Sequence, residues 1–202
     1  MTTIRNSNRK FDARLLCVTL FAGAVGGSTL LAAGRPGGQD AGQGHGGHAQ
    51  DVPATLVQRV RTAATRFADY KAAEAAGYAQ FLGCISGPDH GAMGIHYVNL
   101  PLVDGILDAS QPEVLIYEPV NGSLRLVGVE FVVPVDAWNA SHPVLGTAPP
   151  PPPVLEGQSF LLVDSPNRYG LPPHYELHVW AWRDNPNGAF VDWNNNVSCE
   201  GK

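Results

Sequence analysis

Polar and apolar side chains alternate from His174 to Trp182, a stretch rich in aromatic and β-branched residues. This period of two predicts a β-strand, whose side chains point alternately to its two faces. One face would be an ordinary apolar core face. The other face carries ionisable and indole side chains, namely His174, Glu176, His178, Trp180 and Trp182. Buried polar groups need partners and exposed indoles leave a large apolar area in water, so we expect a cavity lined by both kinds of side chain.

Farther upstream, the apolar residues recur at every third or fourth position. They are Leu56, Val60, Ala63, Phe67, Tyr70 and Ala73. This spacing predicts one amphipathic helix over residues 51–76, with Asp51 as the N-cap, Pro53 in the first turn and Gly77 after the last turn. The stripe is rich in alanine and modest in hydrophobicity, which favours packing on a sheet over binding to a membrane surface.

After Gly77 the period changes from 3.6 to 2, which predicts a series of short strands. Besides 174–182, we expect them at residues 78–82, 93–100, 112–119, 123–133, 160–163 and 190–193. The Asn121-Gly122 pair is typical of a tight hairpin turn between two of these strands. The sequence therefore predicts an α+β domain, with an N-terminal amphipathic helix packed on a curved antiparallel sheet or half-open barrel of six or seven strands.

Alternation along residues 123–133 also predicts which side chains meet the helix. Val127, Val129 and Phe131 would form the core face of this strand. Glu130 would be a lone carboxylate on the opposite, otherwise apolar face.

The N-terminus has the pattern of an export signal. Basic residues precede the uncharged apolar segment Leu15–Ala33, which ends in small residues. We therefore expect a signal peptide over residues 1–33, a disordered linker rich in Gly, His and Gln over 34–50, and a single domain over 51–202. A retained membrane anchor is the alternative, but frequent Gly, Ser and Thr in the segment favour cleavage. The mature protein would then be periplasmic or extracellular and free of the membrane.

Cleavage of the signal peptide would remove Cys17 and leave Cys84 and Cys199. Two cysteines in an exported chain indicate a disulfide bond. A thiolate pair for a metal ion is the weaker interpretation, because neither cysteine has a second cysteine nearby.

Charge and motifs exclude some classes of function. The formal net charge is −5 and no basic stripe with interleaved aromatic residues occurs, so nucleic acid is not an expected partner. No Gly-x-Ser-x-Gly elbow and no Gly-rich strand-to-helix loop occurs, which argues against the corresponding hydrolase and nucleotide-binding sites.

Six histidines and glutamates in the predicted strands are candidate site residues, since charges are rarely buried unless paired or bound to metal. They are His96, Glu118, Glu130, His174, Glu176 and His178. In a first interpretation, His96, Glu130 and His178 ligate one divalent transition metal such as zinc, with His174 or Glu176 close by. In a second, a His/Glu pair performs acid–base chemistry on a small molecule, as a hydrolase, lyase or isomerase would. In a third, the polar groups only satisfy one another in a structural or interaction domain, so whether the protein is an enzyme stays open here.

Five stretches stand out beyond these patterns: Gly91–Asn99, Leu126–Phe131, Leu177–Trp182, Asn185–Gly188 and Trp193–Cys199. In these stretches the chain resembles a group of exported bacterial proteins of unknown function. The resemblance covers about residues 55–199. It implies export and a single domain, and it brings no activity, cofactor or site residue.

Overall fold

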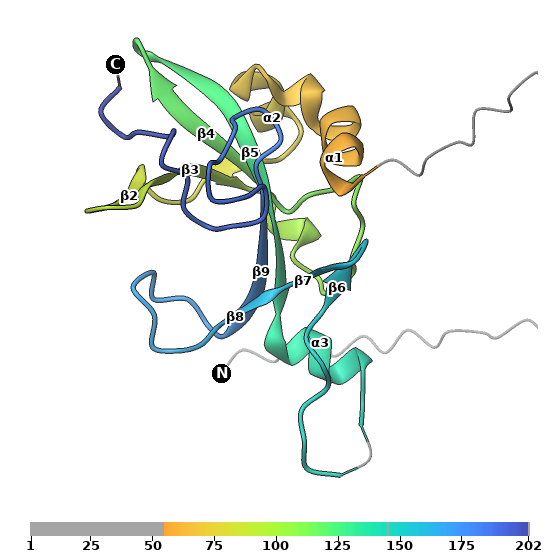
Figure 1. Ribbon diagram of the computed structural model, residues 1–202. Helices are drawn as coiled ribbons and strands as arrows, with labels where there is room; N and C mark the ends of the chain where they lie inside the picture. The colour runs from red at the N-terminus through yellow and green to blue at the C-terminus, as the bar shows by residue number, and fades with distance from the viewer. Residues whose placement is uncertain (1–54, 145, 202) are drawn as a thin grey trace, which may run out of the picture. The chain divides into compact units, whose positions relative to one another are not determined.

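The computed structural model describes residues 55–144 and 146–201, in which short helices precede and flank a β-sheet (Figure 1). The helical elements are α1 (Leu56–Ala64), η1 (Thr65–Phe67), α2 (Tyr70–Ala75), η2 (Leu100–Leu102) and α3 (Val135–Ser141). The strands are β1 (Ala79–Gln80), β2 (Ile85–Gly87), β3 (Gly91–Val98), β4 (Val114–Val120), β5 (Ser123–Pro134), β6 (Val154–Leu155), β7 (Gln158–Ser159), β8 (Leu161–Val163) and β9 (His174–Val179). The predicted signal peptide and linker lie outside the described residues and stay predictions.

The helix predicted over residues 51–76 is interrupted and begins later than expected. Thr55 is the N-cap: its hydroxyl accepts the N–H of Gln58, and the Gln58 side chain accepts the N–H of Thr55. This capping box satisfies two N–H groups that the helix itself leaves free. After η1, Asp69 accepts the N–H of Lys71 and starts α2 as a second helix. The N-cap of α1 is thus Thr55, and the predicted roles of Asp51 and Pro53 lie outside the described residues. The apolar spacing missed the break because η1 keeps Phe67 in the same stripe.

Seven strands form one antiparallel sheet in the order β1-β3-β4-β5-β9-β8, with β2 paired to β3. Strand β5 is the longest, and it extends from the hairpin with β4 to α3 (Figure 1). The sheet does not close into a barrel, because its strand order ends at β1 on one side and β8 on the other. The predicted α+β class, the antiparallel pairing and a sheet of seven strands are confirmed, and this sheet is not closed into a barrel.

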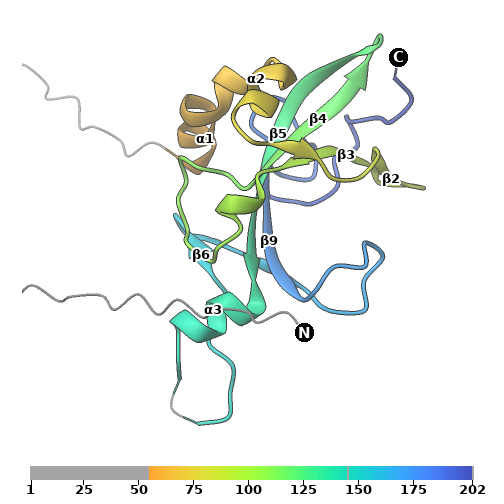
Figure 2. The same cartoon turned by 180° about the vertical axis from the view of Figure 1, so that it is seen from behind.

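Helices α1 and α2 cover one face of this sheet (Figures 1 and 2). Two tyrosines tie the covered face together, since the Tyr117 hydroxyl donates to the Phe67 carbonyl and the Tyr78 hydroxyl donates to the Pro112 carbonyl. Each hydroxyl has a partner although both rings are buried, as buried phenols require. The prediction that the N-terminal helical segment packs on the sheet is confirmed.

A β-bulge changes the alternation along β5. Ile116 pairs with Gly128 and Tyr117 pairs with Leu126, so Val127 is an extra residue opposite β4. As a result, Leu126 shares the helix-covered core with Val129, whereas Val127 packs with Ile116 in a second cluster. The predicted placement of Val129 on the core face is confirmed, and that of Val127 is wrong.

The C-terminal tail crosses the second face of the sheet instead of forming the strand predicted at 190–193. Turns and bends occupy this segment, and an isolated bridge joins Ala92 to Asn194. Val197 completes the second apolar cluster. The predicted disulfide between Cys84 and Cys199 is present and holds the tail to the segment before β2.

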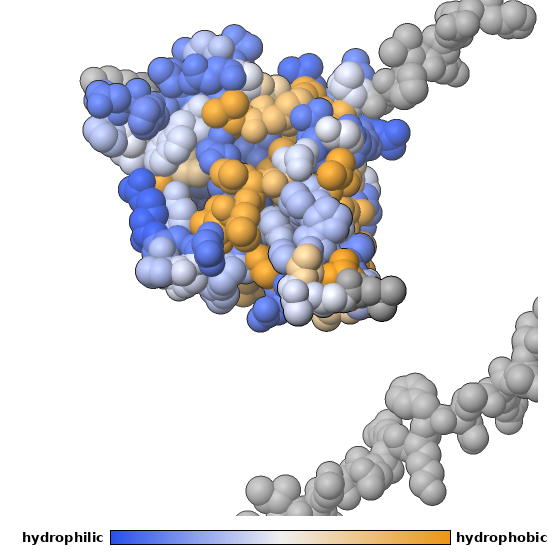
Figure 3. All heavy atoms as spheres, turned by 60° about the horizontal axis from the view of Figure 1, so that its bottom comes forward, coloured by the Kyte–Doolittle hydropathy of each residue, from blue (hydrophilic) through white to orange (hydrophobic). Residues whose placement is uncertain are grey.

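Apolar side chains also reach the surface of the domain. One face shows them in patches between polar side chains (Figure 3). Among the described residues, no helix has the length and apolar character needed to cross a bilayer.

Glu113 is a buried carboxyl group just before β4, only 2% exposed, and its Oε2 accepts the N–H of Val132. Burial raises its pKa from 4.5 to about 8. Between these values the folded state binds more protons than the unfolded state, so stability falls as pH rises, by about 1.4 kcal/mol per pH unit. Glu113→Gln keeps an oxygen for Val132 and should remove this loss, so that the variant is the more stable protein at pH 8. Urea unfolding of both proteins at pH 5 and pH 8 measures the change in the free energy of unfolding.

The control for this prediction is Glu74→Gln, because the Glu74 side chain is exposed on α2. This variant should keep the pH dependence of the native protein. If Glu113→Gln and the native protein lose equal stability between pH 5 and pH 8, the buried carboxyl is not the cause.

Candidate metal centre and adjoining cavity

The second face of the sheet collects the ionisable residues that the sequence places in strands. Glu130 on β5 pairs with His178 on β9, and Glu176 and His174 follow at alternate positions along β9. Since every second residue of a strand points to the same side, these four side chains share one face. His96 reaches the same face from β3, which lies on the other side of β4 from β5.

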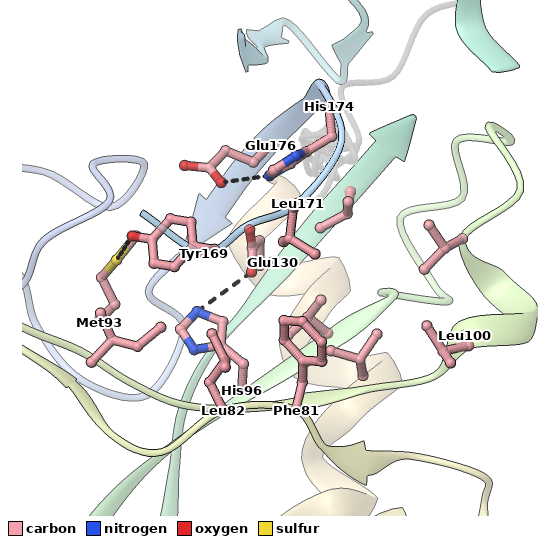
Figure 4. A pocket seen from close by; sticks show the side chains of 15 residues that line it. Phe81, Leu82, Met93, His96, Leu100, Glu130, Tyr169, Leu171, His174 and Glu176 are labelled. Carbon is pink, nitrogen blue, oxygen red and sulfur yellow. Dashed lines mark hydrogen bonds and ion pairs between the residues drawn. The ribbon is translucent and has the colours of Figure 1, made fainter. Parts of the chain in front are cut away.

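Three of these residues converge. One ligand atom each from His96, Glu130 and His178 lies within 4.8 Å of the others. His96 Nε2 is 3.5 Å from Glu130 Oε2, and the two side chains point toward one another (Figure 4). Two ligands on a tetrahedral zinc ion, with bonds of about 2.0–2.1 Å, lie roughly 3.3–3.5 Å apart. The His96–Glu130 separation thus equals that of two ligands of one zinc ion, and the ligand atom of His178 lies within 4.8 Å of both.

His178 is the most constrained member of the trio. Its side chain is fully buried, and within the described part of the chain neither ring nitrogen has a hydrogen-bond partner. The rings of His96 and Trp180 contact it, with centroids 6.0 and 6.1 Å away. Buried polar side chains are nearly always hydrogen-bonded, so this imidazole leaves room for a further group, a water molecule or an ion, between these side chains.

Asp192 belongs to the same cluster, and it was not among the candidates selected from the sequence, although it lies in the strand predicted at 190–193. One ligand atom each from Glu176, His178 and Asp192 also lies within 4.8 Å of the others. His178 Nδ1 is 3.5 Å from Asp192 Oδ1. The aspartate comes from the C-terminal tail, whose turns have no periodicity that could have revealed its position.

Burial and neighbouring charges drive the two histidines of the trio in opposite directions. Burial and the proximity of His178 lower the pKa of His96 to about 3. For His178, burial is the largest effect and alone would lower the pKa, but Glu130, Asp192 and Glu176 together outweigh it and raise the pKa to about 9. Burial raises the pKa of Glu130. The surroundings of His178 thus favour a positive charge at a place that water cannot reach.

A cavity of about 150 Å³ adjoins this cluster. Its polar lining is His96, Glu130, Tyr169, His174 and Glu176. Its apolar lining is Phe81, Leu82, Ile85, Met93, Val98, Leu100, Val103, Val114, Val132 and Leu171. His96 and Glu130 belong to both the trio and the cavity, whereas His178 does not line the cavity.

His174 and Glu176 form a second pair on the cavity wall, with His174 Nε2 3.5 Å from Glu176 Oε2 (Figure 4). The Nδ1–H of His174 donates to the Pro172 carbonyl at 2.8 Å. Burial alone would lower the pKa of His174, but the contacts with Glu176 and Pro172 outweigh it and raise the pKa. Glu118, the remaining candidate, is elsewhere in the sheet and pairs with Arg125.

Trp180 and Trp182 do not line this cavity, which corrects the expectation from strand alternation. Strand β9 ends at Val179, and beyond it the Trp180 and Trp182 N–H groups donate to the carbonyls of Ala189 and Val127. Trp180 packs in the second apolar cluster, and its indole N–H donates to the Val191 carbonyl. Trp182 packs against the helix-covered core.

No protein-family model, curated protein or solved structure matches this chain. The resemblance to exported bacterial proteins stays a prediction. The function proposed below is based on the geometry of the cluster and its cavity.

Proposed function

We propose that the domain binds one divalent transition metal, such as zinc, through His96, Glu130 and His178. The observation that carries the proposal is the fully buried imidazole of His178, whose Nε2 has no hydrogen-bond partner among the described residues, with ligand atoms of the other two residues within 4.8 Å. Imidazole and carboxylate together are typical ligands of zinc and of other first-row metals. A metal ion would supply the positive charge that the carboxylates around His178 favour, and it would displace the protons that these groups otherwise hold.

Asp192 supports the choice of ligand atom on His178. Histidines that bind metal usually donate their second ring N–H to a carboxylate or carbonyl, which fixes the ring orientation. Nδ1 of His178 faces Asp192, so we assign Nε2 as the ligand atom and Asp192 as a positioning residue. Three protein ligands leave a fourth position open, as in zinc sites that bind or transform a small molecule.

We also propose that this metal protein works outside the cytoplasm. The Cys84–Cys199 disulfide supports export, because such bonds form and persist in oxidising compartments. The signal-peptide pattern before residue 34 supports the same location.

The test is elemental analysis of the protein purified under native conditions without chelators. One equivalent of a transition metal is expected, and His96→Ala and His178→Ala should each abolish it. His90→Ala is the matched control, because His90 is exposed and outside the cluster, and it should keep the metal. A native protein without metal, or full occupancy in both site variants, would overturn the proposal.

Acid–base catalysis in the same cavity is the second candidate function. It is favoured by His96 and Glu130, which line the cavity 3.5 Å apart and have pKa values shifted in opposite directions. A neutral imidazole and a protonated carboxyl can act as a base and an acid toward one substrate. A metal-free native protein would favour this candidate over the metal site.

A further inference from the structure

We propose that the metal-loaded protein binds a short-chain aliphatic monocarboxylate, with its carboxylate on the metal and its chain in the adjoining cavity. The inference rests on the metal site proposed above and adds the class of ligand. It depends on three features of the structure: the direction in which the site is open, its charge, and the size and lining of the cavity.

The open coordination position would face the cavity. His96 and Glu130 line the cavity, whereas His178 is fully buried and does not line it. An ion held between the three side chains therefore has protein behind it on the His178 side. The direction away from His178 leads into the cavity, where a fourth ligand can approach.

The charge of the site favours a monoanion. A divalent ion with one carboxylate, Glu130, and two neutral imidazoles carries a net charge of +1, and an uncompensated charge is costly in surroundings with little water. A monocarboxylate would bring this sum to zero. Neither of the other two carboxylates is a ligand of the ion in this arrangement. Glu176 lies 3.5 Å from His174, which serves as its partner. Asp192 lies behind the His178 ring, 3.5 Å from its Nδ1, and its side chain is 25% exposed, so that water screens its charge.

The lining and the size of the cavity favour an aliphatic chain of limited length on the carboxylate ligand. Ten of its fifteen lining residues are apolar, and the two polar pairs are grouped near Tyr169, with Leu100 on the far side (Figure 4). A protein cavity of about 150 Å³ is large enough for benzene, so an aliphatic chain of up to about six carbons fits. Phe81 and Leu82 are 39% and 38% exposed, so this part of the wall reaches the surface and offers a way in.

The experiment titrates acetate, butyrate, hexanoate and decanoate into the zinc-loaded full-length protein, measured by isothermal titration calorimetry. The metal content of the same sample is determined first. Affinity should rise about fourfold for each methylene from acetate to hexanoate, as expected for burial of each group. Decanoate should bind no more tightly than hexanoate, because its chain exceeds the cavity. The protein stripped of metal should bind none of the four.

A matched pair of variants separates the cavity from the metal. Leu171→Trp fills the cavity and should keep one zinc ion and acetate binding while losing the rise with chain length. Leu162→Trp places the same side chain on β8, at a residue that is 49% exposed and does not line the cavity, and should behave like the native protein.

The outcomes distinguish this inference from the proposed function. Stoichiometric zinc at the three ligands with no dependence on chain length would overturn the carboxylate ligand and leave the metal site standing. Equal binding of carboxylates with and without zinc would also overturn the carboxylate as a ligand of the metal and leave the metal site standing. Failure of the protein to bind zinc would overturn both.

Discussion

Replacing both His178 and Glu130 by leucine is expected to leave the metal-free protein as stable as the native protein or to stabilise it by about 1–4 kcal/mol, while abolishing metal binding. Both side chains are buried, and His178 has no hydrogen-bond partner among the described residues. Each of the two belongs to an ionic contact of the cluster, Glu130 with His96 and His178 with Asp192. Exchanging buried ionic groups for apolar residues of similar volume is often neutral or stabilising, because the cost of removing the charges from water disappears. Chemical denaturation in the presence of a chelator, with metal analysis alongside, measures both effects.

The matched control is the same exchange at His174 and Glu176. His174 donates to the Pro172 carbonyl, so leucine there leaves a carbonyl without its partner. This second variant should be less stable than the native protein, by about 1–3 kcal/mol. If instead the His178/Glu130 exchange costs 3 kcal/mol or more without metal, the cluster is a structural network and not a ligand site.

Replacing Cys84 and Cys199 by serine is expected to destabilise the domain by about 4–5 kcal/mol. The disulfide closes a loop over a sequence separation of 115, and the loss of freedom it imposes on the unfolded chain grows with loop length. It also holds the C-terminal tail, whose Val197 covers the second apolar cluster. Urea unfolding of the two proteins measures the difference.

Reductant provides the control for the disulfide. Dithiothreitol should lower the stability of the native protein toward that of the double serine variant and should leave the variant unchanged. A difference of less than about 1 kcal/mol between the two proteins, the usual size for a surface substitution, would contradict the role given to this bond.

Local sequence patterns were sufficient to predict much of the sheet. The Asn121-Gly122 turn was predictable because both residues adopt positive φ, at 48° and 76°, and few other dipeptides tolerate that backbone. Alternation in β9 identified its two faces correctly as far as Val179. A strand that is buried on both faces still shows which side carries its polar residues.

Features that depend on contacts between distant segments were not predictable. The bulge at Val127 follows from how β5 pairs with β4, and its only local signal was Gly128 beside it, because a glycine inside a strand often marks a bulge. The end of β9 depends on hydrogen bonds from Trp180 and Trp182 to other segments, which alternation cannot reveal. The break before α2 had a weak signal in Asp69, a residue more common at N-caps than inside helices.

The residues of the candidate site also differ in how far they could be predicted from the sequence. His96, Glu130 and His178 could be selected because each is a polar residue opposite an apolar face of its own strand. Tyr169 and several of the apolar wall residues come from loops and turns, where no period exists to place them. Asp192 lies in the segment 190–193, which was predicted as a strand but forms turns and bends. The sequence thus indicated the three converging residues and a cavity beside them, but not most of the side chains that line this cavity.

X-ray absorption at the zinc K-edge of the zinc-loaded protein tests the metal site most directly, because it reports the atoms bonded to the ion. The proposed site predicts two imidazole nitrogens at about 2.0–2.1 Å, a carboxylate oxygen at about 2.0–2.2 Å, and one further light atom in the fourth position. Glu130→Gln should remove or lengthen the oxygen contribution and keep both imidazoles. A spectrum with sulfur neighbours, or with six oxygen ligands and no imidazole, would contradict a zinc ion bound by His96, Glu130 and His178.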